Sequence, residues 1–425
     1  MRTFTSSVPV IATHCYKNYK DELLLRKVFG KTPTTSKVGN FYTLENINNV
    51  NHQDALTHSM RKEVNMIEQF LDEIIEKAES IGASDVHITA DRYANYRVKG
   101  TLHLDTGGRK YSMSDLTQMF QKLGLNMQNY ETTGACDAGL TLRNSRLRLH
   151  FYRSLGNMSL SIRLLPSSIP DFSTLQLPKV LLDFIKKRTG LVIVTGATGS
   201  GKSTTLASMI EYTNQQKDKK IITVEDPIEY IYEDKKSLIM QREIGIDVPS
   251  FEKAISQAMR EDPNILLVGE LRDLDTIKSA LSMAETGHLV FGTLHTRGAA
   301  ESFNRLIDVF PGDQRDEIRT QLAGLTQGVI SQQLIYSSKL DNLVPLVEVL
   351  VMTQGARGSI ATGGNLSNLK DAIQQGHQKH HSQSFGQSAA QLIADGKLAL
   401  EDIKDVFDEE EIKKLRANLS GRLHK

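Results

Sequence analysis

The chain has 425 residues, of which 39% are hydrophobic and 24% are charged, an ordinary globular composition that suffices for two or three domains. Its 51 Lys and Arg residues balance 50 Asp and Glu residues to a net charge of +1, so we expect neither nucleic acid nor an anionic membrane as the main partner. Cys15 and Cys136 stand far apart and outside any CxxC motif, which argues against a disulfide framework or a zinc knuckle and favours the cytoplasm. No apolar run reaches the roughly 18 residues of a membrane span, so we expect no transmembrane segment.

The N-terminal part of the chain divides by composition into an extension and a small domain. Residues 1–60 are polar and rich in Asn, Thr and Lys, so we interpret them as an N-terminal extension whose order the composition leaves open. Within residues 61–166, helical patterns and strand-like runs such as YRVKGTLHL and RLRLHFYRS predict a small α+β domain. Prolines at 166, 170 and 178 indicate a linker, which we assign to residues 167–189.

A strictly alternating pattern begins at residue 190. Four apolar runs, LVIVT, IITVE, NILLVGE and HLVFGTLH, are separated by helix-compatible segments. This alternation predicts an α/β domain over residues 190–352, with a mostly parallel sheet covered on both faces. Helical patterning is expected to continue through DQRDEIRTQLAGLTQGVISQQLI, followed by a strand or buried segment at LVPLVEVLVM. We predict a C-terminal helical region over residues 353–425, with a loop around QQGHQKHHSQS.

The run LVIVTGATGSGKSTT, residues 191–205, matches the phosphate-binding pattern GxxxxGK(S/T) at every fixed position. An apolar strand leads into the glycines and a helix-compatible run leaves them, so backbone N–H groups and a helix N-terminus converge on the phosphates of ATP. Lys202 is expected at the β- and γ-phosphates, and the Ser203 hydroxyl is expected to bind Mg²⁺. The predicted nucleotide-binding residues are Gly196, Ala197, Thr198, Gly199, Ser200, Gly201, Lys202, Ser203 and Thr204.

Carboxylates follow two of the predicted strands. Glu270 ends the run NILLVGE, where a doubly wound sheet places its ligands, and it occupies the Walker B position as a candidate for Mg²⁺ binding. Glu225, Asp226 and Glu229 lie in VEDPIE after the neighbouring strand, and one of them is a candidate catalytic base. The alternatives are a solvated acid at a strand end and a helix cap, and spacing alone does not choose among the three acids of VEDPIE.

Histidines form two groups that we interpret differently. His288 and His295 flank the last apolar run of the alternating pattern, where a hydrogen-bonded structural histidine is the ordinary interpretation. His377, His380 and His381 lack a cysteine or an acid at ligand spacing, so we expect a solvated loop there rather than a metal site.

Arginines are concentrated in the small N-terminal domain. The alternation in RLRLH places arginines on one face of a strand, which is ordinarily a solvated face. The functional alternative is that one or two of them act as arginine fingers across a domain or subunit boundary. The arginines of this group are Arg143, Arg146, Arg148, Arg153 and Arg163.

Four segments resemble, in order and spacing, the Walker A, Asp box, Walker B and His box of the secretion ATPase superfamily: TGATGSGKSTT, ITVEDPIEY, ILLVGELRDLDTI and AETGHLVFGTLHT. With QREIG, RLIDVFP and VISQQLI, the chain is most similar to the type IV pilus twitching-motility (retraction) ATPases over roughly residues 62–350. ASDVH at 83–87 and RVKG at 97–100 are similar to the N-terminal PAS-like domain of that family. The resemblance implies a RecA-like P-loop domain preceded by a smaller PAS-like domain.

The resemblance also implies roles for individual residues. Glu229 corresponds to the catalytic glutamate, Glu270 acts at Mg²⁺ and the γ-phosphate, and His295 is the His-box residue. Arg148 and Arg163 fall where the family has arginines that reach a nucleotide. The family further implies a homohexamer that hydrolyses ATP in the cytoplasm and is peripherally recruited to an inner-membrane platform protein.

Departures from the family pattern keep other functions open. At the family's retraction motif the chain reads GARGS at residues 355–359, with Arg357 retained. The tetracysteine zinc site of pilus assembly and type II secretion ATPases is absent from the sequence. A conjugation or type IVB secretion ATPase is therefore the alternative machine, and a nucleotide-gated binding protein with little turnover is the alternative of another class.

Overall fold

The computed structural model describes residues 70–98, 100–142, 145–165, 168–364 and 366–422. The predicted extension over residues 1–60 lies outside them, and the domain boundaries predicted from the sequence stay a prediction. A helix over residues 70–80 precedes the first described strand. No helix in the described ranges is long and apolar enough to cross a bilayer.

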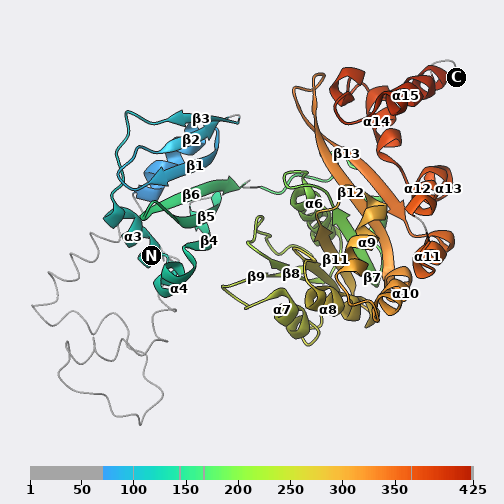
Figure 1. Cartoon of the computed structure of the whole chain (residues 1–425), viewed down its shortest axis with the longest axis horizontal. Helices are drawn as coiled ribbons and strands as arrows, with labels where there is room; N and C mark the ends of the chain where they lie inside the picture. The colour runs from blue at the N-terminus through green and yellow to red at the C-terminus, as the bar shows by residue number, and fades with distance from the viewer. Residues whose placement is uncertain (1–69, 99, 143–144, 166–167, 365, 423–425) are drawn as a thin grey trace, which may run out of the picture. The chain divides into compact units, whose positions relative to one another are not determined.

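The first sheet is antiparallel and has six strands in the order β3-β2-β1-β6-β5-β4 (Figure 1). Its strands are β1 (Ala83–Thr89), β2 (Asn95–Val98), β3 (Thr101–Leu104), β4 (Ala135–Leu142), β5 (Ser145–Ser154) and β6 (Asn157–Leu165), with helices α3 (Met113–Lys122) and α4 (Met127–Thr133) between β3 and β4. In β5, Leu147, Leu149 and Phe151 are fully buried, so Arg146 and Arg148, which alternate with them along the strand, lie on the opposite face. The arginine-bearing face predicted from RLRLH is confirmed.

The second sheet has seven strands in the order β13-β12-β7-β11-β10-β8-β9, and every neighbouring pair is parallel except β12 with β13. Its strands are β7 (Gly190–Thr195), β8 (Lys220–Glu225), β9 (Leu238–Glu243), β10 (Ile265–Val268), β11 (Leu289–Leu294), β12 (Thr326–Ser337) and β13 (Asn342–Val351). The predicted mostly parallel sheet is confirmed. Because parallel strands share one carboxyl edge, the segments after β7, β8, β10 and β11 meet there.

Helices cover both faces of this sheet, as the continuous apolar strands predicted. Along β7, Leu191 and Ile193 pack with the helices of one face, while Val192 and Val194 pack with those of the other. The first face is covered by α7 (Phe251–Ala258), α8 (Leu274–Glu285), α9 (Ala299–Asp308) and α10 (Arg315–Leu325), and the second by α5 (Leu181–Phe184) and α6 (Lys202–Gln216).

The helical region at the C-terminus is attached to the sheet rather than separate from it (Figure 1). It comprises α11 (Gln354–Ala361), α12 (Leu366–Gln375), α13 (His377–His380), α14 (Phe385–Ala394), the 3₁₀ helix η3 (Leu400–Ile403) and α15 (Glu409–Arg422). Val344 and Leu346 of β13 share one buried cluster with Leu392, Leu398 and Ile403. The C-terminal helices therefore complete the core of the strand pair β12–β13.

Two local predictions are wrong. The helix expected to run through VISQQLI ends at Leu325, and β12 begins at Thr326, because this β-branched segment pairs with β7 and β13 on its two edges. The loop expected around QQGHQKHHSQS is largely helical, in α12 and α13, because Leu369 and Ile373 bury one face of α12 against the core.

Candidate nucleotide-binding site

The loop between β7 and α6 has the backbone of a phosphate cradle. Gly196, Gly199 and Gly201 have φ of 149°, 79° and 85°, values that side chains rarely tolerate. A Cβ on Gly196 would lie 2.3 Å from the carbonyl oxygen of Gln332, in the neighbouring strand β12. Gly201 directly precedes α6, so the positive end of that helix points at this loop.

Lys202 lies between the loop and the predicted carboxylates. Its Nζ donates hydrogen bonds to the carbonyl oxygens of Gly196, at 2.8 Å, and Ala197, at 3.1 Å. Burial lowers the pKa of Lys202, while the negative charges of Glu270 and Glu229 raise it. The lysine therefore feels the field of both predicted catalytic carboxylates, although they follow different strands.

Glu270 and His295 face each other after the adjacent strands β10 and β11. His295 Nε2 lies 3.6 Å from Glu270 Oε1. The Thr293 hydroxyl donates to the carbonyl of Gly269, which fixes the two strand ends against one another. Burial lowers the pKa of His295, and the charge of Lys202 lowers it further. The imidazole is therefore neutral at pH 7 and offers one donor and one acceptor nitrogen.

The acids of the VEDPIE segment occupy different environments. Glu225 accepts a hydrogen bond of 2.7 Å from Thr223 Oγ1, and burial raises the pKa of Glu225 to about 7. Burial also raises the pKa of Asp226. Of the three acids, only Glu229 carries a charge that shifts the pKa of Lys202. The charge of Glu229 therefore acts on the P-loop lysine, and that of Glu225 is not among the influences on its pKa.

The residues after Lys202 provide hydroxyl groups at the start of α6. Ser203 is exposed, and its hydroxyl has no hydrogen-bond partner among the described residues. Thr204 Oγ1 lies 2.9 Å from the hydroxyl of Tyr230, and Thr205 Oγ1 donates to Gln332 Oε1 at 2.7 Å. Ser203 is therefore the hydroxyl of this turn that remains available to a ligand.

The two predicted arginine fingers are cross-strand neighbours. Arg148 on β5 stands opposite Arg163 on β6, so both lie on one face of the small sheet. Arg163 Nε donates to Asp85 Oδ1 at 2.8 Å, while the charge of Arg148 lowers the pKa of Asp226 against the effect of burial. The sequence did not predict Asp85 as the partner, although the strand run ASDVHI contains it.

A cavity of about 610 Å³ adjoins the start of α6, and sequence reasoning missed most of its lining. Gly201, Thr204 and Thr205 form its P-loop side. The rest comes from the linker and from β12 and β13, and includes Leu175, Leu177, Leu334, Leu343 and Pro345. These residues lie far apart in the sequence, and of the five only Leu334 lies in a segment that resembles the family, VISQQLI. Only the fold brings them together.

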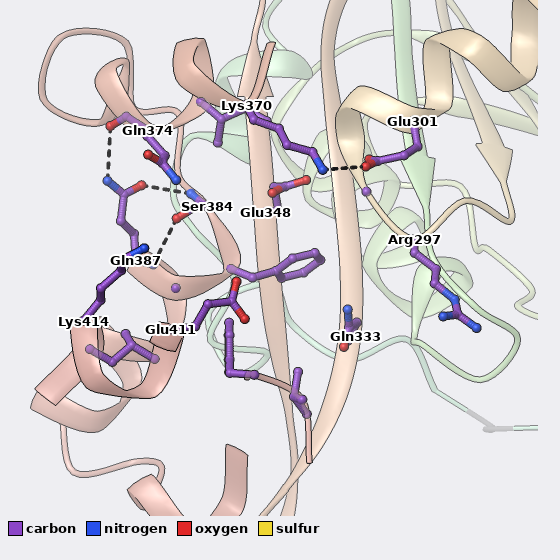
Figure 2. A pocket seen from close by; sticks show the side chains of 17 residues that line it. Arg297, Glu301, Gln333, Glu348, Lys370, Gln374, Ser384, Gln387, Glu411 and Lys414 are labelled. Atoms are coloured by element: carbon purple, nitrogen blue, oxygen red, sulfur yellow. Dashed lines mark hydrogen bonds and ion pairs between the residues drawn. The ribbon is translucent and has the colours of Figure 1, made fainter. Parts of the chain in front are cut away.

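A second cavity, of about 790 Å³, lies between the strands β12 and β13 and the C-terminal helices (Figure 2). Its three acids are engaged within the protein. Glu301 pairs with Lys370 at 3.0 Å, Glu348 accepts the Ala299 N–H at 2.8 Å, and Glu411 accepts the Asp408 N–H at 3.1 Å. Arg297 lines this cavity and also a smaller one of about 490 Å³, which is formed by residues 196–200 together with Asp405 and Val406. The C-terminal region therefore borders the P-loop.

Comparison with known proteins identifies the family. The model of the type II/IV secretion system protein family matches residues 60–342. The chain belongs to this family. It is 36% identical over 336 residues to the type IV pilus retraction ATPase PilT of Pseudomonas aeruginosa, which covers 76% of this chain and 94% of that protein.

Solved structures agree with this assignment. The crystal structure of the pilus retraction motor PilT with bound ADP matches with a TM-score of 0.72 and 38% identity, over 80% of this chain and 98% of that one. The Legionella pneumophila ATPase DotB matches with a TM-score of 0.69 and 29% identity, over 83% and 96%. The predicted resemblance to pilus and secretion ATPases and the predicted fold class are confirmed. The roles of individual site residues stay predictions.

Proposed function

We propose that this protein hydrolyses ATP to drive a type IV pilus retraction machine or a related pilus or secretion machine. The observation that carries the proposal is the gathering of Lys202, Glu270 and His295 beside the P-loop, with His295 Nε2 3.6 Å from Glu270 Oε1. A protein that only binds nucleotide needs the loop and the lysine alone, whereas hydrolysis requires carboxylates placed at the γ-phosphate. The ADP-bound PilT structure supports a nucleotide site in this fold.

Each residue then has a definite task. The backbone N–H groups of residues 196–204 and the N-terminus of α6 bind the phosphates, and Lys202 exchanges its loop carbonyls for the β- and γ-phosphates. Glu229 accepts the proton of the attacking water, and His295 orients Glu270 through its nearby Nε2.

The residues present also fit a magnesium ion. Ser203 and Glu270 would hold it, because a free hydroxyl and a carboxylate are hard oxygen donors. Held by these residues, such an ion would neutralise negative charge on the phosphates of ATP.

The cavity of about 610 Å³ beside α6 is the proposed place of the adenosine. It opens from Gly201 and Thr204, the residues that follow the phosphate cradle, and its leucines offer apolar surface to a base. In this arrangement the nucleoside lies next to the start of α6, the helix that follows the phosphate cradle.

We propose a homohexamer in which Arg148 and Arg163 reach the nucleotide of a neighbouring subunit. Asp85 engages Nε of Arg163, and the Arg163 side chain is 58% exposed, so its terminal nitrogens are accessible to a phosphate. Arginines in a separate domain complete a neighbour's site only when subunits associate head to tail, and such contacts form a ring when the rotation between neighbouring subunits closes. The ring is expected in the cytoplasm, bound to an inner-membrane platform protein.

The segment at the retraction motif does not distinguish a pilus retraction machine from a secretion machine. Arg357, the retained residue of that motif, donates hydrogen bonds to the carbonyls of Ala323 and Gly324 at the end of α10. This contact caps the C-terminal end of α10. A structural role therefore accounts for the presence of Arg357, and no role in retraction is needed. The similarity to DotB supports a conjugation or type IVB secretion ATPase as the second candidate.

The experiment is a deletion of the gene in its own host, complemented with the wild type and with Lys202→Ala. Pilus retraction should stop in the deletion strain, with surface pili accumulating, and only the wild-type gene should restore it. Normal retraction combined with loss of conjugal transfer or effector secretion would favour the second candidate. Full function of Lys202→Ala would exclude both motors and favour a binding protein.

A further inference from the structure

Arg146 connects strand β5 to the segment that carries Glu229. Its Nη2 donates to Glu243 Oε2 at 2.6 Å, and its Nε donates to the carbonyl oxygen of Ile228 at 3.2 Å. The same Glu243 Oε2 accepts the backbone N–H of Ile228 at 3.1 Å. One ion pair therefore holds both backbone polar groups of the residue that directly precedes Glu229.

This ion pair is shielded from water. The side chains of Arg146 and Glu243 are 13% and 5% exposed. Gly139 of β4 leaves room for the ion pair, and it lies opposite Arg148 of β5. A Cβ on Gly139 would lie 2.3 Å from Arg146 Nη2 and 2.9 Å from Glu243 Oε1. Burying two charges carries a large desolvation cost unless hydrogen bonds satisfy them. Here the Ile228 backbone and Thr141 Oγ1, 3.3 Å from Nη1, provide these bonds.

We propose that Arg146 is a positioning residue for Glu229, acting through Glu243 and the backbone of Ile228. The inference rests on the proposed catalytic role of Glu229. The network fixes the backbone on the N-terminal side of Glu229, and a carboxylate that abstracts a proton must be held within a fraction of an ångström of its productive place.

Arg146 also lies on the same strand as the proposed arginine finger. Arg148, the proposed finger, lies two residues further along the same strand and on the same face. A displacement of β5 that moves Arg148 therefore also pulls on Ile228. Strand β5 therefore joins two proposed roles. Arg148 contacts the nucleotide, and Arg146 aligns Glu229.

The test is steady-state ATP hydrolysis by the full chain carrying Arg146→Gln or Arg146→Lys. Arg153→Gln is the matched control, because Arg153 lies on the same strand but contacts Tyr130 and the carbonyl of Glu131. We expect Arg146→Gln to lower kcat roughly ten- to a hundredfold, as displaced catalytic groups do, with KM for ATP and the Kd of a fluorescent ADP analogue unchanged. Arg146→Lys keeps a charge for Glu243 and should recover part of kcat, and Arg153→Gln should resemble the wild type.

An unchanged kcat in folded Arg146→Gln would overturn the inference, and so would equal losses of kcat and of ADP affinity. These outcomes leave the proposed function intact as long as Lys202→Ala abolishes hydrolysis. Hydrolysis that survives in Lys202→Ala would instead contradict the proposed function itself. If circular dichroism shows that Arg146→Gln is unfolded, Glu243→Gln replaces it, because its amide oxygen still accepts the Ile228 N–H. The same loss of kcat is then expected, and a normal kcat would overturn the inference.

Discussion

His295 and Glu270, which follow the ends of adjacent strands, face each other with 3.6 Å between Nε2 and Oε1. Because burial and Lys202 lower the pKa of His295, the imidazole is neutral above its ordinary pKa of about 6.5 and charges only when the pH falls below that value. A neutral imidazole can orient Glu270 without adding positive charge beside Lys202. If the pair acts in hydrolysis as proposed, the rate of hydrolysis depends on the protonation of His295.

We predict that kcat for ATP hydrolysis is constant above about pH 6.5 and declines as the pH falls through the lowered pKa of His295. His295→Asn keeps hydrogen-bonding capacity but cannot titrate, so it should lower kcat and move the acid decline to lower pH. The measurement is kcat between pH 5 and 8 for both proteins. An identical acid decline in the variant would assign that decline to another group.

Glu225→Gln should stabilise the protein at alkaline pH. The pKa of Glu225 is about 7 in the folded chain, against an ordinary value of 4.5. The folded state therefore binds the proton more tightly, and the Glu225 contribution to stability is present at low pH and lost as the pH rises towards 7. The neutral glutamine avoids this loss, by about 1–3 kcal/mol at pH 8.

Thermal or urea unfolding at pH 5 and pH 8 measures the effect of Glu225→Gln. The free-energy advantage of the variant over the wild type should appear at pH 8 and shrink at pH 5. The catalytic rate constant should stay within a few-fold of the wild type. A large loss of kcat would instead move the catalytic role from Glu229 to Glu225.

Gly196→Ala should abolish nucleotide binding. The added Cβ would lie 2.3 Å from the Gln332 carbonyl oxygen, and Gly196 has a φ of 149°, which disfavours a side chain. The loop must therefore move away from β12, and its N–H groups then no longer point together at the phosphates. Isothermal titration with ADP measures the change. Gly312→Ala is the control, since a Cβ at that position meets no atom within 4 Å, and it should bind ADP normally. Wild-type affinity in Gly196→Ala would show that the loop tolerates the displacement.

Much of the site was predictable because its signals are local. Each of these signals lies next to an apolar strand, and the strand order brings them to the carboxyl edge of the parallel sheet. They are the P-loop, the carboxylates after β8 and β10, and His295. The ion pair of Arg146 with Glu243 was not predictable, because 97 residues separate its partners and the QREIG segment that contains Glu243 does not indicate which residue pairs with it. Segment β12 was misassigned because its pairing between β7 and β13 outweighs the helical pattern that precedes it.

The C-terminal helices should be required for a stable ATPase domain. Truncation after Gly358 would expose Val344 and Leu346 of β13, which are at most 2% exposed in the full chain. We expect the melting temperature and the ATPase rate to fall together. Retention of both by the truncated protein would show that these helices form only a docking surface.

A matched pair of substitutions on β13 isolates this packing. Leu346→Ala removes a fully buried side chain beneath the C-terminal helices and should cost about 2–5 kcal/mol. Leu343 lies on the same strand and is 54% exposed, so Leu343→Ala should change the free energy of unfolding by less than about 1 kcal/mol. Equal effects in urea unfolding would contradict the packing described for β13.

The central claim is that Glu229 and Lys202 act on one ATP molecule, and a single-turnover measurement tests it most directly. Radiolabelled ATP with Mg²⁺ is mixed with an excess of wild type, Glu229→Gln or Lys202→Ala, and bound ATP and released phosphate are followed together. We predict that Glu229→Gln retains ATP and releases phosphate about 10²–10⁴-fold more slowly than the wild type, as expected when a general base is lost, whereas Lys202→Ala neither retains ATP nor hydrolyses it. Phosphate release at the wild-type rate by Glu229→Gln would contradict the account.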